Sequence, residues 1–361
     1  MKQGWEIKKL GEVCEILDHL RVPITKKDRR EGVYPYYGAS GVQDYVDSYI
    51  FDGRYLLVGE DGAKWGANDK SAYIIEGKSW VNNHAHILKL NENVSDRLVE
   101  YYLVSKDLSE YITGAVVPKL TQQALRSIPI PIPPFPEQEK IVVELDCLSG
   151  VIEKKREQLK ELDALAESIF YTMFGDPITN EKGWEVKKLE DVSTLINGRA
   201  YKQNELLDSG KYKVLRVGNF FTNSNYYYSD LELEEDKYCD DGDLLFAWSA
   251  SFGAFIWNGG KVIYHYHIWK VLYDKQMLNI DYYRFLLNTM TTYFMKDVHG
   301  IGMVHLTKAG MEQYDLPIPP LALQQEFADK IEAIEKQKQL IKKSIEETET
   351  LFNARMDYYF N

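Results

Sequence analysis

Two pairs of histidines have the spacing of residues that could hold a metal ion or a polar ligand. His84 and His86 stand two positions apart in an alternating segment, and His265 and His267 repeat that spacing later in the chain. Residues two apart in a β-strand share a face, so each pair is expected to present two imidazoles together. Zinc would need further His or Cys ligands at suitable spacing, and the sequence offers no obvious set. We therefore expect hydrogen-bonded structural histidines and no metal, with contact to a phosphate or base edge as the alternative.

Three fragments resemble catalytic motifs but lack a required part. Residues 132–135 (IPPF) resemble a loop of amino-methyltransferases, yet an isoleucine stands where a hydrogen-bond acceptor is needed. Residues 77–79 (GKS) end like a phosphate-binding loop, but Ala72 replaces its first glycine. Residues 6–8 (EIK) resemble half of a nuclease site, but they belong to a repeated segment. The sequence thus predicts no catalytic residue.

A basic loop followed by tyrosines points to nucleic-acid binding instead. Residues 26–30 (KKDRR) precede three tyrosines within 34–37, and the chain holds 26 tyrosines in all. The net charge of −12 by itself argues against nucleic acid. However, acidic residues concentrate in 153–167, 232–236 and 346–349. A solvated surface loop is the alternative for the basic run.

Two long helices are expected to position these groups. Proline cannot donate a hydrogen bond in a helix interior, so the proline-rich run 128–136 should be extended and a helix should follow it, from Glu137 to Phe174. That helix would be roughly 55 Å long, at about 1.5 Å per residue. Its apolar residues recur in alternating steps of four and three, which is typical of a helix with a partner helix. The same construction returns 186 residues later, with Pro319 in the place of Pro133.

The predicted seam between these helices is interrupted once in each of them by lysine, at Lys155 and at Lys338. Interruptions in neighbouring layers indicate a device that fixes the register of an antiparallel coiled coil. Two unrelated amphipathic surface helices are the alternative. The predicted seam comprises Ile141, Leu145, Leu148, Ile152, Leu159 and Leu162 in the first helix, and Ile331, Ile334, Ile341, Ile345 and Phe352 in the second.

The repeat extends beyond the helices. Residues 4–13 (GWEIKKLGEV) return as 183–192 (GWEVKKLEDV), and Leu120-Thr121-Gln122 returns as 306–308 (LTK). The chain is therefore predicted to be two tandem α+β modules of mixed sheet and helices, each followed by a long helix. The sequences at the two ends of each module are repeated, while the sequences between these ends differ. This pattern favours two related modules that recognise different targets. The predicted boundaries are 1–128, 129–174, 175–315 and 316–361.

Local patterns predict some of the elements inside the modules. Alternation predicts strands over 81–88, 212–219 and 262–269, and periodicity predicts helices over 97–108 and 281–294. Thr121 is expected to cap a short helix that reaches Ser127.

Composition excludes several classes of protein. A hydrophobic content of 45% with 27% charged residues is typical of a soluble globular chain. No apolar run reaches the roughly 18 residues of a membrane span. The amino terminus also lacks the apolar core of a signal peptide. The cysteines, Cys14, Cys147 and Cys239, are few and far apart, which argues against disulfides. We expect a cytoplasmic protein with no membrane contact.

Several motifs together resemble one family. They are 26–30 (KKDRR), 35–41 (PYYGASG), 59–62 (GEDG), 80–86 (WVNNHAH), 215–219 (LRVGN), 245–253 (LFAWSASFG) and 302–307 (GMVHLT), with the Pro-Pro-x-x-x-Gln openings at 133–138 and 319–324. In order, duplication and motifs, nearly the whole chain resembles the specificity (S) subunit of type I restriction–modification systems. In one departure, the chain is expected to stop with its second helix, without a further conserved tail.

The resemblance implies two target-recognition domains separated by two antiparallel helices with pseudo-two-fold symmetry. It implies double-stranded DNA, two DNA methyltransferase subunits and restriction/translocase subunits as partners. No cofactor is expected on this non-catalytic chain, whereas S-adenosylmethionine, Mg and ATP are expected on the partner subunits. Because DNA also has two-fold axes, the domains should read two half-sites in opposed orientation, with an unread gap set by helix length.

Within each module, Lys and Arg side chains should hold phosphates, whereas amide, hydroxyl and Arg groups should read base edges. Ordinary surface is the alternative for each of them. A coiled-coil protein-interaction scaffold is the alternative for the whole chain, and a self-sufficient nuclease or methyltransferase is disfavoured by the missing motifs. The predicted DNA-binding residues are Lys27, Arg29, Arg30, Arg54, Lys64, Asn82, Asn83 and Lys119 in the first module, and Arg199, Lys202, Arg216, Asn219, Ser249, Ser251 and Lys308 in the second.

Overall fold

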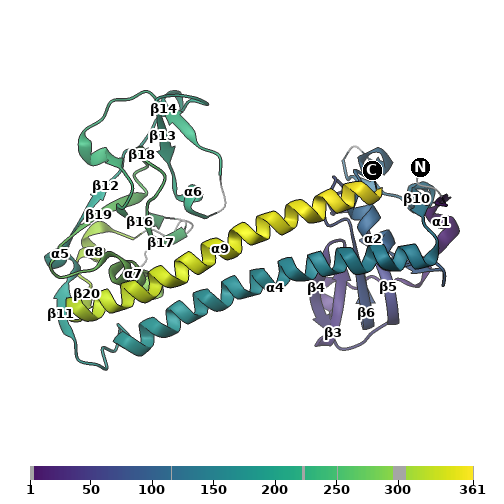
Figure 1. Cartoon of the computed structure of the whole chain (residues 1–361), viewed down its shortest axis with the longest axis horizontal. Coiled ribbons are helices and arrows are strands. Elements are labelled where there is room, and N and C mark those ends of the chain that lie inside the picture. The colour runs from purple at the N-terminus through teal and green to yellow at the C-terminus, as the bar shows by residue number, and fades with distance from the viewer. Residues whose placement is uncertain (1–3, 115, 222–223, 250, 296–305, 361) are drawn as a thin grey trace. The chain divides into compact units, whose positions relative to one another are not determined.

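The chain divides into two compact units that share its two long helices. The computed structural model describes residues 4–114, 116–221, 224–249, 251–295 and 306–360. Unit 1 comprises residues 1–157 and 342–361, and unit 2 comprises residues 158–341. Helices α4 (Phe135–Phe174) and α9 (Leu321–Phe360) each run without interruption from one unit into the other (Figure 1). The units therefore differ from the four predicted segments, because each helix contributes to both of them.

Unit 1 is built on a six-stranded sheet in the order β2-β7-β5-β6-β3-β4. Only the β3–β6 pair is parallel among the described strands of this sheet. The strands are β2 (Cys14–Ile16), β3 (Glu31–Gly38), β4 (Gly41–Val46), β5 (Phe51–Gly59), β6 (Ala72–Val81) and β7 (Ala85–Leu90). Successive side chains along each strand point to opposite faces of the sheet. Leu56 and Leu88 face a core that includes α2 (Asp96–Ser105), whereas Leu57 and Ile87 belong to a second cluster.

Short elements complete unit 1. They are β1 (Glu6–Lys9), α1 (Leu10–Val13), β8 (Ile112–Thr113), β9 (Lys119–Leu120), α3 (Gln122–Ser127), β10 (Pro129–Ile132) and the 3-10 turns η1 (Asp18–Leu20), η2 (Lys26–Asp28) and η3 (Ser109–Tyr111). Thr121 caps α3, since its Oγ1 accepts the N–H of Ala124 at 3.2 Å, which confirms the predicted cap.

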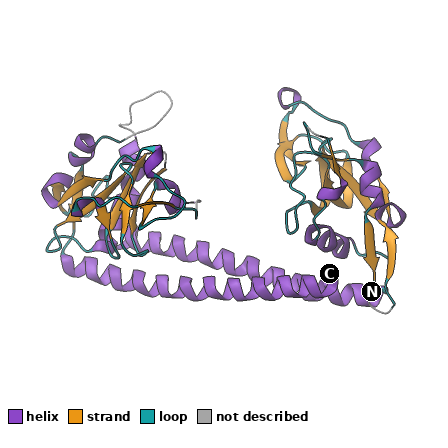
Figure 2. Cartoon of the chain, turned by 90° about the horizontal axis from the view of Figure 1, so that it is seen from above, coloured by secondary structure: helices purple, strands orange, loops and turns teal. Residues whose placement is uncertain are grey.

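Unit 2 holds two four-stranded sheets, in the orders β12-β19-β16-β17 and β14-β13-β18-β15. Figure 2 draws the strands of the chain in orange. The strands of these two sheets are β12 (Ser193–Asn197), β13 (Tyr212–Leu215), β14 (Tyr227–Ser229), β15 (Tyr238–Cys239), β16 (Leu244–Ser249), β17 (Ser251–Ile256), β18 (Val262–Tyr264) and β19 (Ile268–Tyr273). The remaining elements are β11 (Glu185–Lys188), β20 (Asp315–Ile318), α5 (Leu189–Val192), α6 (Val217–Phe221), α7 (Ile280–Phe294), α8 (Lys308–Glu312), η4 (Gln203–Glu205) and η5 (Glu235–Lys237). The α7 side chains Tyr282 and Tyr283 are buried in its largest core.

The sequence repeat is a structural repeat. In unit 1, β1 pairs antiparallel with β10, so the opening segment lies against the proline-rich run; in unit 2, β11 pairs with β20 in the same way. The N–H of Leu10 donates to Ile128 at 2.8 Å, and that of Leu189 donates to Tyr314 at 2.9 Å. Thr307 caps α8 as Thr121 caps α3. The repeated sequences are thus those that join each module to its long helix.

Helix α4 begins at Phe135, two residues before the predicted start at Glu137. Pro136 is therefore inside the helix, which its fixed φ permits because a first-turn N–H has no intrahelical partner. The predicted end at Phe174 is confirmed. The helix predicted over 281–294 is observed as α7, and the helix predicted over 97–108 is observed as α2, which ends three residues earlier, at Ser105.

The two long helices contact each other in antiparallel directions within each unit. In unit 1, Lys155 Nζ donates to Ser344 Oγ at 2.5 Å and to Thr348 Oγ1 at 3.2 Å. In unit 2, Lys338 Nζ lies 2.6 Å from Asp163 Oδ1. Both lysines that interrupt the seam therefore bond to the opposite helix. Of the predicted seam residues, Ile141, Leu145, Ile152, Ile331, Ile334 and Ile345 are buried, and Leu148, Leu159, Leu162, Ile341 and Phe352 are half-buried.

Three predicted strands were wrong in their extent. The segment 81–88 is interrupted by a turn, in which Asn82 Oδ1 accepts the N–H of His84 at 2.8 Å, so that β6 ends at Val81 and β7 begins at Ala85. The segment 262–269 breaks likewise, since the N–H of Ile268 donates to His265 at 3.0 Å. The segment 212–219 leaves its strand at Leu215 and continues as α6.

No helix among the described residues is both long enough and apolar enough to cross a membrane.

Candidate nucleic-acid interface

The basic loop of unit 1 presents three cations to solvent and uses a fourth one internally. Lys26, Lys27 and Arg30 are exposed, and none of them has an ion-pair partner within the described part of the chain. Arg29 lies over the ring of Tyr36 at 4.1 Å, and its Nη1 is 3.2 Å from Asp44 Oδ2. Arg29 thus anchors the loop to β3 and β4, so that the exposed cations are held on a fixed base.

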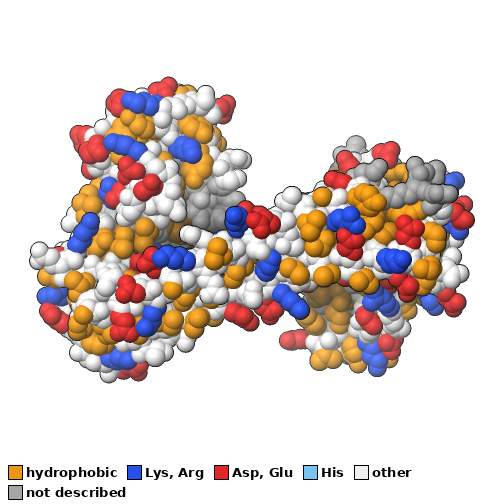
Figure 3. Space-filling view, in the orientation of Figure 1, with side chains coloured by type: hydrophobic (Ala, Val, Ile, Leu, Met, Phe, Trp, Pro, Cys, Tyr) orange, Lys and Arg blue, Asp and Glu red, His pale blue; other side chains and the backbone are white. Residues whose placement is uncertain are grey.

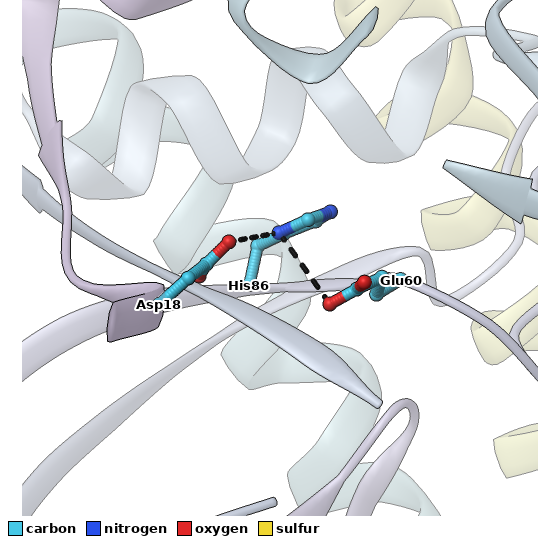
Figure 4. Close-up of side chains that lie close together, drawn as sticks. All are labelled: Asp18, Glu60 and His86. Atoms are coloured by element: carbon cyan, nitrogen blue, oxygen red, sulfur yellow. Dashed lines mark hydrogen bonds and ion pairs between the residues drawn. The ribbon is translucent and has the colours of Figure 1, made fainter. Parts of the chain in front are cut away.

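A buried network of ion pairs lies where β5 and β7 meet the loops of unit 1. The side chain of His86 is 1% exposed, and its ring lies between the carboxylates of Asp18 and Glu60 (Figure 4). Its Nδ1 is 2.6 Å from Asp18 Oδ2, and its Nε2 is 2.8 Å from the carbonyl oxygen of Leu120. Both ring nitrogens of His86 therefore have a hydrogen-bond partner inside the protein. His86 is therefore the hydrogen-bonded structural histidine that the sequence predicted.

Two cations balance the carboxylates of this network. Lys119 Nζ lies 2.6 Å from Glu60 Oε1, and Arg21 Nη1 donates to Glu60 Oε2 and, at 2.9 Å, to the carbonyl oxygen of Ala85. Burial alone would raise the pKa of Glu60, but the hydrogen bonds from Lys119 and Arg21 lower it. Burial would also raise the pKa of Asp18, but the hydrogen bond from His86 lowers it. The network joins the 59–62 loop to the turn before β7 and to β9.

The same cluster has the composition of a metal site. Asp18, Glu60 and His86 each offer a ligand atom, and these atoms lie within 4.8 Å of one another. Both ring nitrogens of His86 are already bonded, however, and the cations of Arg21 and Lys119 would repel a metal ion. The arrangement is that of a self-satisfied charge network. Lys119, a predicted DNA-binding residue, has its ammonium group engaged in this network, although its side chain remains 43% exposed.

The turn between β6 and β7 separates the predicted asparagines. Asn82 is buried, and its side chain bonds Gln43 Oε1 at 3.2 Å and the N–H of His84. Asn83 and His84 are exposed, and His84 Nδ1 bonds Asp61 Oδ1. Only the second asparagine therefore has a free amide group on the surface. His84, which was not among the predicted DNA-binding residues, is held beside it.

Two further predicted residues of unit 1 differ in their availability. Arg54 Nε lies 2.6 Å from Asp96 Oδ2, and Arg54 Nη1 lies 3.4 Å from Glu76 Oε2, so its guanidinium secures the first turn of α2. Lys64 is exposed and has no ion pair among the described residues. The charge of Lys64 is thus more available to a phosphate than that of Arg54.

In unit 2, Arg199 is committed to a carboxylate while its neighbours are not. Its two terminal nitrogens donate to Glu205 at 2.9 and 2.8 Å, and this pairing lowers the pKa of Glu205 to about 2. Lys202 and Arg216 are exposed without ion pairs in the described ranges, and Arg216 lies over the ring of Tyr227 at 5.2 Å. Asn219 holds the backbone of its own turn, since Oδ1 accepts the N–H of Arg216 at 2.8 Å.

The β16–β17 hairpin and α8 hold the remaining predicted residues. Ser249 is buried and its Oγ has no hydrogen-bond partner among the described residues, whereas Ser251 is half-buried. Lys308 Nζ lies 3.6 Å from Glu312 Oε1. Lys308 also lines a pocket of about 380 Å³ with Trp248 and Tyr266, two aromatic residues that are not among the predicted DNA-binding residues. Residues 302–305 of the motif that precedes Lys308 lie outside the described residues.

His265 gives unit 2 an expected pH dependence. Burial, followed by the charges of His267 and Arg216, lowers the pKa of His265 to about 4. In the unfolded chain a histidine binds a proton below about pH 6.5. The unfolded state therefore binds more protons between these two values, and the free energy of unfolding falls as the pH drops from about 6.5 to 4. Between pH 7 and pH 5, the melting temperature of the His265→Asn variant should fall less than that of the unmodified chain. An equal fall in both would contradict this expectation.

Comparison with known proteins agrees with this architecture. The sequence profile of the type I restriction modification DNA specificity domain matches residues 2–164 and 181–350. A putative type I restriction enzyme specificity subunit of Haemophilus influenzae is 27% identical, over 91% of this chain and 87% of the relative. The MjaVIII type I restriction enzyme specificity subunit of Methanocaldococcus jannaschii is 21% identical, over 96% and 90%.

Solved structures share the fold. The S subunit of a type I restriction–modification system from M. genitalium aligns with a TM-score of 0.60 at 12% identity, over 99% of this chain and 97% of that chain. A chain from a type I restriction–modification complex aligns with a TM-score of 0.55 at 16% identity, over 100% and 98%. The chain belongs to the type I restriction–modification DNA specificity family, as its sequence motifs predicted. It is a specificity subunit with two DNA specificity domains, and the alternative of a protein-interaction scaffold is set aside.

Proposed function

We propose that the globular part of each unit reads one half of a bipartite, asymmetric DNA site, and that α4 and α9 fix the length of the unread gap. The observation that carries the proposal is the duplication of the frame. In both units an opening strand, a threonine-capped helix and a proline-rich strand lead into a 40-residue helix. The globular parts between these repeated elements differ, which fits two domains that recognise two different half-sites.

Phosphate contacts fall to those predicted DNA-binding cations that are exposed and have no ion pair among the described residues. These predicted residues are Lys27, Arg30 and Lys64 in unit 1 and Lys202 and Arg216 in unit 2. On the face that Figure 3 shows, basic and acidic side chains are interspersed and gather into no single basic patch among the described residues. This distribution fits a subunit whose partners supply much of the phosphate contact. Asn83 and His84 are the exposed groups of unit 1 best suited to reading base edges.

The partners in this proposal are two DNA methyltransferase subunits and, for restriction, translocating nuclease subunits, acting together in the cytoplasm. S-adenosylmethionine, Mg and ATP would be bound by those subunits. Exposed apolar side chains on the long helices offer docking area, since Val143 is 68% exposed and Leu340 is 70% exposed.

Removing the unpaired cations of unit 1 tests the proposed interface. The triple variant Lys27→Ala, Arg30→Ala, Lys64→Ala should weaken binding of the assembled complex to its target DNA. Fewer counterions are released on binding when phosphate contacts are lost, so the slope of log K against log salt should become shallower by about one per lost contact. Lys89→Ala, which removes another exposed charge from unit 1, is the matched control. A salt slope that stays unchanged in the triple variant would refute the assignment of these residues.

A further inference from the structure

Two buried glutamines occupy the same place in the two units. Gln138 is the fourth residue of α4 and Gln324 is the fourth residue of α9, and their exposures are 1% and 0%. They are the glutamines of the two Pro-Pro-x-x-x-Gln openings. Each lies where a recognition domain joins the long helix that follows it. A polar side chain buried this completely must be hydrogen-bonded to remain there at low cost.

The hydrogen bonds of the two glutamines match one for one. In unit 1, Gln138 Oε1 accepts the N–H of Ser95 at 2.8 Å, and its Nε2 donates to the carbonyl oxygens of Pro133 at 2.9 Å and Asn93 at 3.1 Å. The bonds to Ser95 and Asn93 cross from the long helix to the segment that starts α2. The bond to Pro133 fixes the proline-rich entry against the same helix.

Unit 2 repeats this arrangement with different neighbours. Gln324 Oε1 accepts the N–H of Asn279 at 2.8 Å, and its Nε2 donates to the carbonyl oxygens of Pro319 at 2.8 Å and Met277 at 2.9 Å. Ser95 and Asn279 are the N-cap residues of α2 and α7. The glutamine is therefore kept although the partners that surround it have changed.

An amide is the side chain that suits this position. In a capping box, the third residue of a helix accepts the N–H of its own N-cap, but in these helices that residue is Leu98 or Tyr282. The glutamine of the long helix supplies the missing acceptor from outside. The position also requires two donors, which glutamate lacks, and one acceptor, which lysine lacks.

We propose that Gln138 and Gln324 are positioning residues for DNA recognition. Each clamps its recognition domain to its long helix at a fixed angle, and the two clamps together set how strictly the complex enforces the gap between half-sites. This inference rests on the proposed function. A recognition surface must be held within about 0.5 Å and 10–20° of its working geometry. If the contact between domain and helix becomes flexible, the preference for one gap length should therefore weaken before the sequence preference at the half-sites does.

The test replaces each glutamine by methionine, which keeps the length and volume but makes none of the three bonds. The apolar contacts of Ile141 and Leu145 remain in unit 1, so the chain should still fold. Complexes assembled with the methyltransferase subunits are offered duplexes with the native gap, or with one base pair more or fewer. Gln138→Met and Gln324→Met should each lower the discrimination against wrong gaps about tenfold, a change of about 1.4 kcal/mol. The two half-site sequences should stay the same.

Exposed glutamines on the same helices provide matched controls. Gln158→Met on α4 and Gln337→Met on α9 change side chains that are exposed, and they should leave gap discrimination unchanged. Glutamine-clamp variants that reject wrong gaps as strongly as the unmodified chain would overturn the proposal. An unmodified complex without any gap preference would instead refute the proposed function.

A second measurement needs no variant and decides the matter if the methionine chains fail to assemble. In the unmodified complex, amide hydrogen exchange should show the N–H groups of Ser95 and Asn279 protected as strongly as core amides, because each is bonded to a buried side chain. Exchange of these two amides at the rate of exposed turns would overturn the clamp.

Discussion

Duplicating one heptad in each long helix, residues 153–159 in α4 and 341–347 in α9, should widen the gap in the methylated DNA sequence. A heptad adds about 10 Å of helix, at about 1.5 Å per residue. That length spans about three base pairs of B-DNA, at 3.4 Å per base pair. Both half-sites should remain as they are, because the recognition domains are untouched. The measurement is a map of methylated sites in cells that carry the variant.

The heptad design keeps the seam in phase. Lys155 and Ser344 lie in the duplicated segments, so their hydrogen bond is duplicated as well. Three added base pairs also rotate one half-site by about three tenths of a DNA turn, so the variant should bind more weakly than the unmodified chain. Three heptads in each helix add about 31 Å, close to one DNA turn of 34–36 Å, and should restore much of that binding.

The matched control lengthens α4 alone by the same heptad. The helices are then unequal, the layers beyond the insertion no longer face each other, and methylation at gapped sites should be lost. A gap that stays unchanged after both helices are lengthened would refute the idea that they measure it.

Glu60→Ala should unfold or strongly destabilise the recognition domain of unit 1. The substitution removes the carboxylate that faces Arg21 and Lys119, and the Arg21 side chain is only 14% exposed. Breaking a buried charge network by removing one partner costs about 3 kcal/mol or more, because the remaining charges lose the carboxylate that balances them. Thermal unfolding of the purified chain measures the loss. Methylated DNA should show that discrimination at the half-site of unit 1 fails while the other half-site is retained.

Glu76→Ala is the control for this prediction. Its side chain is 74% exposed and lies 3.4 Å from Arg54, so its loss should cost less than about 1 kcal/mol, as for other surface ion pairs. Equal melting temperatures for Glu60→Ala and the unmodified chain would show that the network contributes little to stability.

The frame of the molecule was predictable because local rules govern it. Proline excludes a helix interior, heptads require a partner, and Thr121 has the chemistry of an N-cap, so these elements appeared where the sequence placed them. The turn at Asn82 was missed because strict alternation conceals a turn that contains neither glycine nor proline. An asparagine side chain makes that turn by bonding the backbone of His84.

The availability of the charged residues was not predictable from sequence. Arg54 and Asp96 are 42 residues apart, yet they form an ion pair at 2.6 Å. Lys119 and Glu60 are likewise distant in the chain and adjacent in space. Only the fold shows which cations already have carboxylate partners. The glutamines of the Pro-Pro-x-x-x-Gln motifs were visible in the sequence as a resemblance, but their role depends on carbonyl and amide groups that the fold brings to them.

The central claim is that this chain selects DNA by two half-sites a fixed distance apart. A genome-wide methylation map of cells with and without the gene tests it most directly. We predict that one bipartite motif of constant gap is methylated in the presence of the gene and unmethylated in its absence. Identical maps, or the loss of a continuous motif without a gap, would contradict the claim.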